Sequence, residues 1–530
     1  MHELPDDPGS NVPWRVETNG INVLGEDQCS GTARDLFWVW FAANVGVLDV
    51  IIGGIVYTFR LSLFEMVVVV VGGTVASFAL VGVLSVAGLL GRAPMMTLSR
   101  RVFGLRGNLV PGFVSWVSLA GWETLAVITG TLAVMGVLQM VAHLGGVASG
   151  LVSLAVVGGM SVAFGLLGQA TLVVVQRWGS WILGGLTCLV AGELVRGAGW
   201  HQVATARGGS FLGAVLPAMS IVVASTGLSW SNAAADYSRY TTAVAGRRRV
   251  FLAGVAGASV PMVLLLFAGV LAGSRDASLA SSPNPVDAIR HALPGWMAVP
   301  YLLTAAAGMV VQADLGLYSS GMNLLNLRVR MRRSRSVLID AAIMLAGSIY
   351  VLFIARNFLT PFTSFILILG VGLAAWAGVF VAAWAWPSGR PSTADLAVIY
   401  SPDVSTSIVT RGVGWPAISG FLAGSLAGIL TSASPLYTGP LARGIFAQSS
   451  LSLPVAMAVA ASVFAVAAGG MSLVRRVHSA SSRQVGVTGS VTQADTGLEE
   501  TAAVPALQGT GMNGHASAVL RKAAAGKGAK

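Results

Sequence analysis

Charged side chains are scarce in this chain. Only 10% of its 530 residues are Asp, Glu, Lys or Arg, whereas 55% are hydrophobic. A soluble globular domain carries about 25% charged residues. The shortage of charge argues against a soluble protein. Together with 66 glycines, which permit close helix packing in lipid, it predicts a polytopic membrane protein.

Cysteine and metal-binding patterns are also missing. The two cysteines, Cys29 and Cys188, lie in a polar segment and in an apolar stretch, an arrangement that argues against a disulfide framework. The six histidines show no metal-ligand spacing, and no pairing of a nucleophile with a base is visible. We therefore expect no enzyme activity, no metal and no cofactor.

Twelve apolar stretches are long enough to cross a bilayer, which takes about 20 residues. They cover approximately residues 36–58, 63–91, 109–140, 146–172, 179–195, 211–234, 250–273, 296–325, 337–355, 360–387, 412–432 and 451–474. Residues 1–35 are polar, contain no signal peptide and are expected to form a cytoplasmic tail. Residues 477–530, rich in Ser, Thr, Ala and Gly, are expected to form a disordered cytoplasmic tail.

The net charge of +11 is explained by membrane orientation rather than by nucleic-acid binding, because most basic residues lie in short loops between apolar stretches. One alternate set of loops contains Arg92, Arg100, Arg101, Arg106, Arg177, Arg239, Arg247, Arg248, Arg249, Arg328, Arg330, Arg332, Arg333, Arg335, Arg390 and Arg411. The other set contains only Arg60, Arg196, Arg207, Arg275, Arg290, Arg356 and Arg443. The richer set is predicted to be cytoplasmic, so both termini are predicted to lie in the cytoplasm. The protein itself is predicted to be a multi-pass protein of the plasma membrane.

The sixth stretch is polar in its second half. Its polar or small residues include Ser225, Thr226, Gly227, Ser229, Trp230, Ser231 and Asn232. Irregular polar backbone survives at membrane depth only beside a cavity or buried in protein. A span interrupted in this way indicates a transporter binding site.

Two further stretches carry buried acids. The first contains Asn44 and Asp49, and the third contains Trp122 beside Glu123. A carboxylate at membrane depth is a functional-site hypothesis, although Asp49 could instead cap a break or pair with a buried arginine. Trp122 could stack on a planar heterocycle, and Glu123 could accept hydrogen bonds from the N–H groups of that ring. Alternatively, Trp122 could be a packing or lipid-facing residue.

Polar residues also gather in the eighth stretch and after the sixth. The eighth contains Gln312, Asp314 and Gly316 near further hydroxyl and amide side chains, for which hydrogen bonding between helices is an equally good explanation. Asp236 and Arg239 are three residues apart, so they share a helix face and can pair. Their position among arginines suggests a cytoplasmic gate or a structural latch.

Four stretches together resemble the nucleobase–cation symporter family 1, especially its cytosine/purine permease branch. They are SRRVFGLRGNLVPG at 99–112, Gly121-Trp122, DYSRY at 236–240 and LGVGLAAWAGVF at 369–380. The resemblance covers about residues 30–475 and implies an all-α, leucine-transporter-like fold. In that fold residues 36–195 and 211–387 form two inverted five-helix repeats with helices 1 and 6 broken, and 412–474 add two peripheral helices.

The resemblance also implies a site between spans 1, 3, 6 and 8. Trp122 takes the role of the third-span tryptophan that stacks on the ligand, and Trp230 resembles the sixth-span tryptophan, which lies nearer Gly227 in hydantoin-type members. Ala126 stands in the third span where many members have an amide. The two amide side chains of the family's eighth span align near Gln312 and Gly316, and this chain keeps only the first of them. The predicted substrate-binding set is Asn44, Trp122, Glu123, Ala126, Gly227, Trp230, Gln312 and Gly316.

The coupling ion is predicted from a difference between this chain and the sodium-coupled members of the family. The eighth-span hydroxyls of sodium-coupled members align near Val310 and Val311, while Asp49, Glu123 and Asp314 place three carboxyl groups in the spans. This pattern favours proton coupling through Asp314 or Asp49; a relaxed sodium site completed by Asp314 is the alternative.

The sequence thus predicts a symporter that imports a nucleobase, such as cytosine or a purine, or a related planar heterocycle. Two alternatives remain: a sodium-coupled carrier of a hydantoin-, allantoin- or vitamin-type compound, and a membrane receptor that does not transport. The expected partners are the small heterocycle and the bilayer, with no nucleic acid. The sequence does not indicate an oligomeric state.

Overall fold

Helices make up nearly all of the regular structure in this computed structural model, which describes residues 11–276, 279, 282, 284–329, 331–355, 359–385, 412–434 and 437–488. Within those ranges, residue pairing of the β type is confined to two isolated bridges, Gly31 with Thr241 and Ala433 with Thr438. The chain divides into two units, residues 1–470 and 471–530. The first unit holds the helices described below, and the described part of the second is the end of helix α22 (Ser452–Thr488).

Among the described residues, ten helical stretches are long and apolar enough to cross a bilayer. Six of them are single helices or parts of one: α6 (Leu109–Val141), α7 (Gly146–Leu167), α8 (Gln169–Arg196), α13 (Arg247–Arg275), α16 (Arg333–Phe353) and Leu367–Ala385 of α17 (Leu359–Ala385). A seventh is Ser452–Gly470 of α22. The other three are composite: Leu63–Gly91 ends in α4 (Gly73–Gly91), Phe211–Ser238 runs from η3 (Phe211–Val215) to α12 (Ala234–Ser238), and Gly295–Asn326 consists of η7 (Gly295–Met297) and α15 (Ala298–Asn326). A bent pair, α1 (Ala33–Ala43) and α2 (Val47–Tyr57), and the shorter apolar helix α20 (Trp415–Thr431) correspond to the other two predicted spans. The predicted polytopic helical fold is confirmed.

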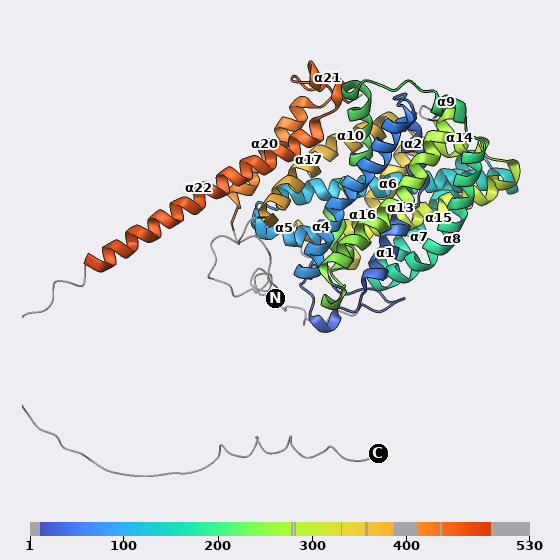
Figure 1. Cartoon of the computed structure of the whole chain (residues 1–530). Coiled ribbons are helices and arrows are strands. Elements are labelled where there is room, and N and C mark those ends of the chain that lie inside the picture. Colours follow the sequence, from blue (N-terminus) through green and yellow to red (C-terminus); the bar gives the residue numbers. More distant parts are fainter. Residues whose placement is uncertain are drawn as a thin grey trace, which may run out of the picture. The chain divides into compact units, whose positions relative to one another are not determined.

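Short helices connect the spans. They are α5 (Met95–Phe103), α9 (Trp200–Ala204), α14 (Pro285–His291) and α21 (Ile445–Ser449). Among the long helices, α15 packs along α6, and α13 packs along α1, α2 and α4 (Figure 1). Gly53 on α2 and Gly269 on α13 meet at one crossing, where a Cβ on either residue would collide with the backbone of the other helix. Small residues thus bring these two helices into close contact.

The first span is broken between α1 and α2, whose axes differ by 61°. Asn44 leaves the helical conformation, and Gly46 is extended at φ −145° and ψ 151°. The Asn44 side-chain amide donates to the Trp40 carbonyl at 2.8 Å. A Cβ on Gly308 of α15 would lie 2.7 Å from the Val45 carbonyl oxygen, so glycine at this position lets α15 approach the break.

The sixth span is broken at Thr226, between α10 (Leu216–Ser225) and α11 (Gly227–Trp230). Thr226 has φ −105° and ψ −120°, which is outside the helical region. Ser77 on α4 bonds both sides of the break: its hydroxyl donates to the Val223 carbonyl at 3.0 Å and accepts from the Leu228 amide at 2.8 Å. A neighbouring helix therefore satisfies the backbone groups that the break frees.

Two predicted boundaries differ from the structure. The break between the fourth and fifth spans falls at Gly168, whose φ of +87° suits glycine, so α8 begins before the predicted residue 179. Helix α22 continues to Thr488, and residues 477–488 of the predicted disordered tail are helical. Residues 489–530 lie outside the described part of the chain.

Candidate substrate pocket

Five elements that are distant in sequence enclose one cavity: α2, α6, the interrupted sixth span, α13 and α15. It is lined by Asp49, Leu119, Trp122, Glu123, Ser225, Ser229, Trp230, Met262, Gln312 and Gly316. The broken spans contribute Asp49, Ser225, Ser229 and Trp230. The two breaks thus open their polar groups toward a common space.

Two tryptophans form aromatic walls of this pocket. Trp122 contacts the ring of Phe365 on α17 edge to face, with centroids 6.2 Å apart and planes at 72°. Gly121 makes this contact possible, because a Cβ there would overlap the Phe365 ring. Trp230 is held edge to face against Trp40, with centroids 5.9 Å apart. Both indoles are therefore fixed by aromatic neighbours outside the pocket.

Unpartnered acceptors distinguish the pocket chemically. Both carboxyl oxygens of Glu123, Oδ2 of Asp49 and Oε1 of Gln312 are buried without a hydrogen-bond partner in the described part of the chain. The hydroxyls of Ser225 and Ser229 are instead committed to carbonyls of their own span. Buried polar atoms are nearly always paired, so a set of free acceptors around one cavity is complementary to a ligand rich in N–H donors.

The cavity is small in this conformation. Its open space is about 20 Å³, which corresponds to roughly one water molecule. The Glu123 side chain lies against Gly316, where a Cβ would overlap it. A heterocycle can therefore bind only if lining side chains move outward.

The structure brings together most, but not all, of the residues proposed from sequence. Trp122, Glu123, Trp230, Gln312, Gly316 and Asp49 line the cavity. Four others do not line it. Asn44 bonds the end of α1, Ala126 packs in the core, and Gly227 contacts α4. Asp314 is fully buried, and neither of its carboxyl oxygens has a hydrogen-bond partner among the residues that the structure describes.

Four lining residues were missing from the predicted set: Leu119, Ser225, Ser229 and Met262. The polar break in the sixth span was a usable signal for the two serines. Met262 lies on α13 among apolar residues, and no local pattern marks it.

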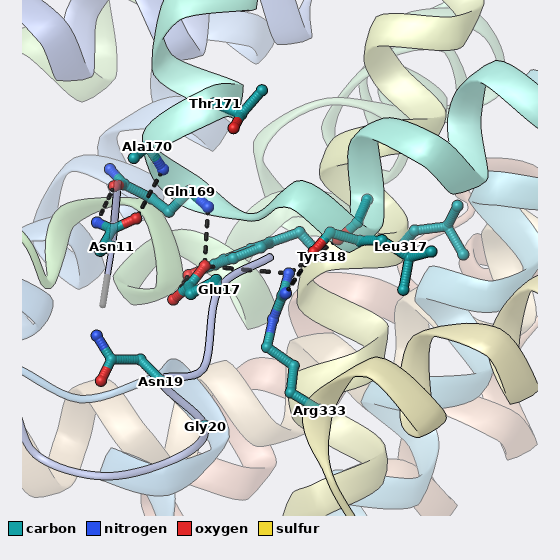
Figure 2. Close-up of polar contacts among 12 residues, drawn as sticks. Asn11, Glu17, Asn19, Gly20, Gln169, Ala170, Thr171, Leu317, Tyr318 and Arg333 are labelled. Atoms are coloured by element: carbon teal, nitrogen blue, oxygen red, sulfur yellow. Dashed lines mark hydrogen bonds and ion pairs between the residues drawn. The ribbon is translucent and has the colours of Figure 1, made fainter. Parts of the chain in front are cut away.

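The arginine-rich end of the bundle is closed by an N-terminal strap, residues 11–32, which the sequence predicted to be a polar tail. Figure 2 shows Glu17 of the strap inserted between α8, α15 and α16. Its side chain is completely buried and pairs with Arg239 at 3.1 Å. Arg333 lies 4.0 Å from the other carboxyl oxygen, and the Gln169 amide donates to that oxygen at 2.8 Å.

Further bonds fix the strap along its length. The Tyr240 hydroxyl donates to Glu17 at 2.5 Å, and Arg239 donates to the Gly20 carbonyl at 2.8 Å. Asn11 exchanges hydrogen bonds with Gln169 and the Ala170 amide at the start of α8 (Figure 2). The strap therefore ties the start of α8 to the end of the sixth span.

The expected pairing of Asp236 with Arg239 is replaced by other contacts. Asp236 accepts from the Met95 amide at 2.7 Å, at the start of α5. Arg239 reaches Glu17 instead. Their three-residue spacing permitted a pair, but a carboxylate 222 residues away in sequence supplies a better-placed partner for the buried guanidinium.

Comparison with known proteins gives a consistent result. Residues 24–474 match a family described as permease for cytosine/purines, uracil, thiamine, allantoin. The chain is 24% identical over 377 residues to the "Putative purine-cytosine permease YxlA" of Bacillus subtilis (strain 168), covering 69% of this chain and 78% of that protein.

Two solved structures share the fold. One is Mhp1, a nucleobase-cation-symport-1 family transporter in a closed conformation with bromovinylhydantoin bound, with a TM-score of 0.64, 16% identity and coverage of 86% of this chain and 93% of that one. The other is a Na⁺-coupled sialic acid symporter in a substrate-bound outward-open state, with a TM-score of 0.57, 10% identity and coverage of 83% and 91%. The fold is therefore leucine-transporter-like, and the protein is a membrane transporter rather than an enzyme. The chain belongs to the family of permeases for cytosine/purines, uracil, thiamine and allantoin.

Proposed function

We propose that this transporter imports a nucleobase, cytosine or a purine, or a closely related planar N-heterocycle, in symport with protons. The observation that carries the proposal is the pocket itself: aromatic walls at Trp122 and Trp230, with unpartnered acceptors on Glu123, Asp49 and Gln312. A flat ring with N–H and amino groups at its edge satisfies both features.

The binding chemistry follows from these groups. The ring stacks on the Trp122 face, as bases stack on aromatic side chains. Glu123 and Gln312 accept hydrogen bonds from ring and exocyclic N–H groups. Because a buried acceptor without a partner is costly, a ligand that lacks these donors is selected against.

Proton coupling is supported by the surroundings of the first break. Three α15 residues that approach it, Gly308, Met309 and Gln312, carry no hydroxyl group for a sodium ion. Tyr301 and Thr304 of α15 line a small cavity beside the break, but their hydroxyls donate to the carbonyls of Val286 and Pro300. Asp49 and Asp314 are buried carboxyl groups without a charged partner in the described ion pairs. A sodium-coupled carrier of a hydantoin-, allantoin- or vitamin-type compound is the competing assignment.

Alternating access requires the strap to open. With the arginine-rich end assigned to the cytoplasm, the Glu17–Arg239 pair holds the inner side closed, and its release lets the ligand leave. Asp236 contributes by holding α5 against the sixth span. A contact made in one state only shifts the inward–outward equilibrium without touching the ligand.

Uptake into proteoliposomes tests the proposal. Radiolabelled cytosine, adenine, hypoxanthine, uracil, allantoin, thiamine and pyridoxine are offered under an inward proton gradient, with sodium or with choline. We expect accumulation of cytosine or a purine that rises with the gradient and ignores the replacement of sodium. Strict sodium dependence at fixed pH contradicts proton coupling, and binding without net uptake indicates a receptor.

A further inference from the structure

One buried carboxyl group lies on α16, outside the pocket. Asp340 on α16 is fully buried. Its Oδ1 accepts a hydrogen bond from the indole Nε1 of Trp116 on α6 at 2.6 Å. Its Oδ2 has no hydrogen-bond partner in the described part of the chain. One oxygen is thus held in place while the other stays available.

A single hydroxyl connects this group to the pocket. Ser320 is one helical turn beyond Gly316, against which the Glu123 side chain lies, so its hydroxyl is close to Glu123 and also to Asp340. This hydroxyl makes a long hydrogen bond to the Leu317 carbonyl, at 3.4 Å, and must turn from it to reach a carboxyl oxygen. Glu123 is 1% exposed, lines the substrate cavity, and has two unpartnered oxygens. Two carboxylates on either side of one buried hydroxyl repel each other when both are charged, so this arrangement favours a state in which one of them carries a proton.

Within the described residues, no ion pair involves Glu123 or Asp340. Of the elements packed against α16, helix α6 carries Glu123 as its only charged side chain, α15 carries Asp314, and α7 carries none. Arg333 and Arg335 are at the start of α16 itself. Arg333 donates to the carbonyls of residues 165 and 166 and lies beside Glu17 of the strap.

The positions of Glu123 and Asp340 give a proton transfer between them a direction. Trp116 precedes Glu123 by seven residues on α6, a distance of about 10 Å along the helix toward the arginine-rich end. Asp340 contacts Trp116 and therefore lies on that side of the pocket. A proton that leaves Glu123 for Asp340 moves away from the substrate and toward the strap.

We propose that Asp340 is the inner proton acceptor of this transporter. Protonated Glu123 gives its proton to the Ser320 oxygen while the Ser320 hydroxyl proton passes to Oδ2 of Asp340. Glu123 becomes a carboxylate, Asp340 becomes the acid, and Ser320 is regenerated. Trp116 is a positioning residue that holds Oδ1. This inference rests on the proposed proton symport.

The test uses the full-length protein in proteoliposomes with radiolabelled cytosine or adenine. In Asp340→Asn we expect gradient-driven accumulation to fall at least tenfold, while exchange against preloaded base stays within about twofold of the wild type, because exchange needs no net proton release. Ser348→Ala is the matched control, because Ser348 is buried on the same helix and its hydroxyl donates to the Met344 carbonyl of that helix at 2.8 Å. It should alter neither assay.

Two further variants keep the test decisive if Asp340→Asn does not fold. Ser320→Ala should uncouple accumulation from exchange in the same way, and Trp116→Phe should shift the pH profile of accumulation. Unchanged accumulation in Asp340→Asn or Ser320→Ala, or equal loss of accumulation and exchange, overturns the relay. The relay is also overturned if the wild-type protein exchanges the base but accumulates the base only with sodium. That result leaves the substrate assignment intact. Absence of exchange in the wild type instead contradicts the substrate assignment.

Discussion

Removing the indole of Trp122 should weaken substrate binding more than it weakens the fold. Base–aromatic stacking contributes about 1–3 kcal/mol per base. Since 1.4 kcal/mol corresponds to a factor of ten, Trp122→Ala should raise the Kd of the transported base by roughly 5- to 150-fold. The edge-to-face pair with Phe365, with centroids 6.2 Å apart, adds about 0.5–1.5 kcal/mol to stability, which the variant also loses.

The measurement is equilibrium binding of radiolabelled base to purified protein in detergent, with thermal stability followed in parallel. Trp122→Phe keeps an aromatic face and should recover most of the affinity. Phe365→Leu removes the outer contact but leaves the indole, so it separates loss of stability from loss of stacking. An unchanged Kd in a folded Trp122→Ala protein refutes the argument and makes Trp122 a packing residue.

Three other outcomes follow from the structure. Glu123→Gln should change the preference among bases, because one acceptor becomes a donor; an unaltered inhibition profile across base analogues counts against ligand contact. Gly316→Ala should lower affinity at least tenfold by displacing Glu123, and normal affinity would show that the carboxyl group is not a ligand contact. Burial raises the pKa of the Cys29 thiol in the strap, which slows alkylation at neutral pH. Glu17→Gln should release the strap and speed labelling of Cys29 several-fold in a background without the other cysteine. Glu193→Gln, which removes the ion pair with Arg196 at the far end of α8, should not change the rate, and equal rates in the two variants argue against a releasable strap.

The sequence by itself determined the class of molecule and the position of its breaks. A bilayer requires apolar stretches of a set length and internal hydrogen bonding of the backbone, and both constraints act locally along the chain. The polar interruption around Thr226 and the acids Asp49 and Glu123 were therefore visible as departures from an apolar pattern. The family motifs could be read in the same way, and the match over residues 24–474 confirms the family.

Only the tertiary structure decided which side chains meet. Ala126 is one helical turn beyond Trp122 but is packed in the core, whereas Met262, on a helix without a polar signal, lines the pocket. Arg239 could pair locally but takes Glu17 from a segment that sequence analysis assigned to a polar tail. Asp340 faces Trp116 and Ser320 from another helix. These contacts depend on the packing and rotation of helices that are far apart in sequence, and local periodicity does not specify either one.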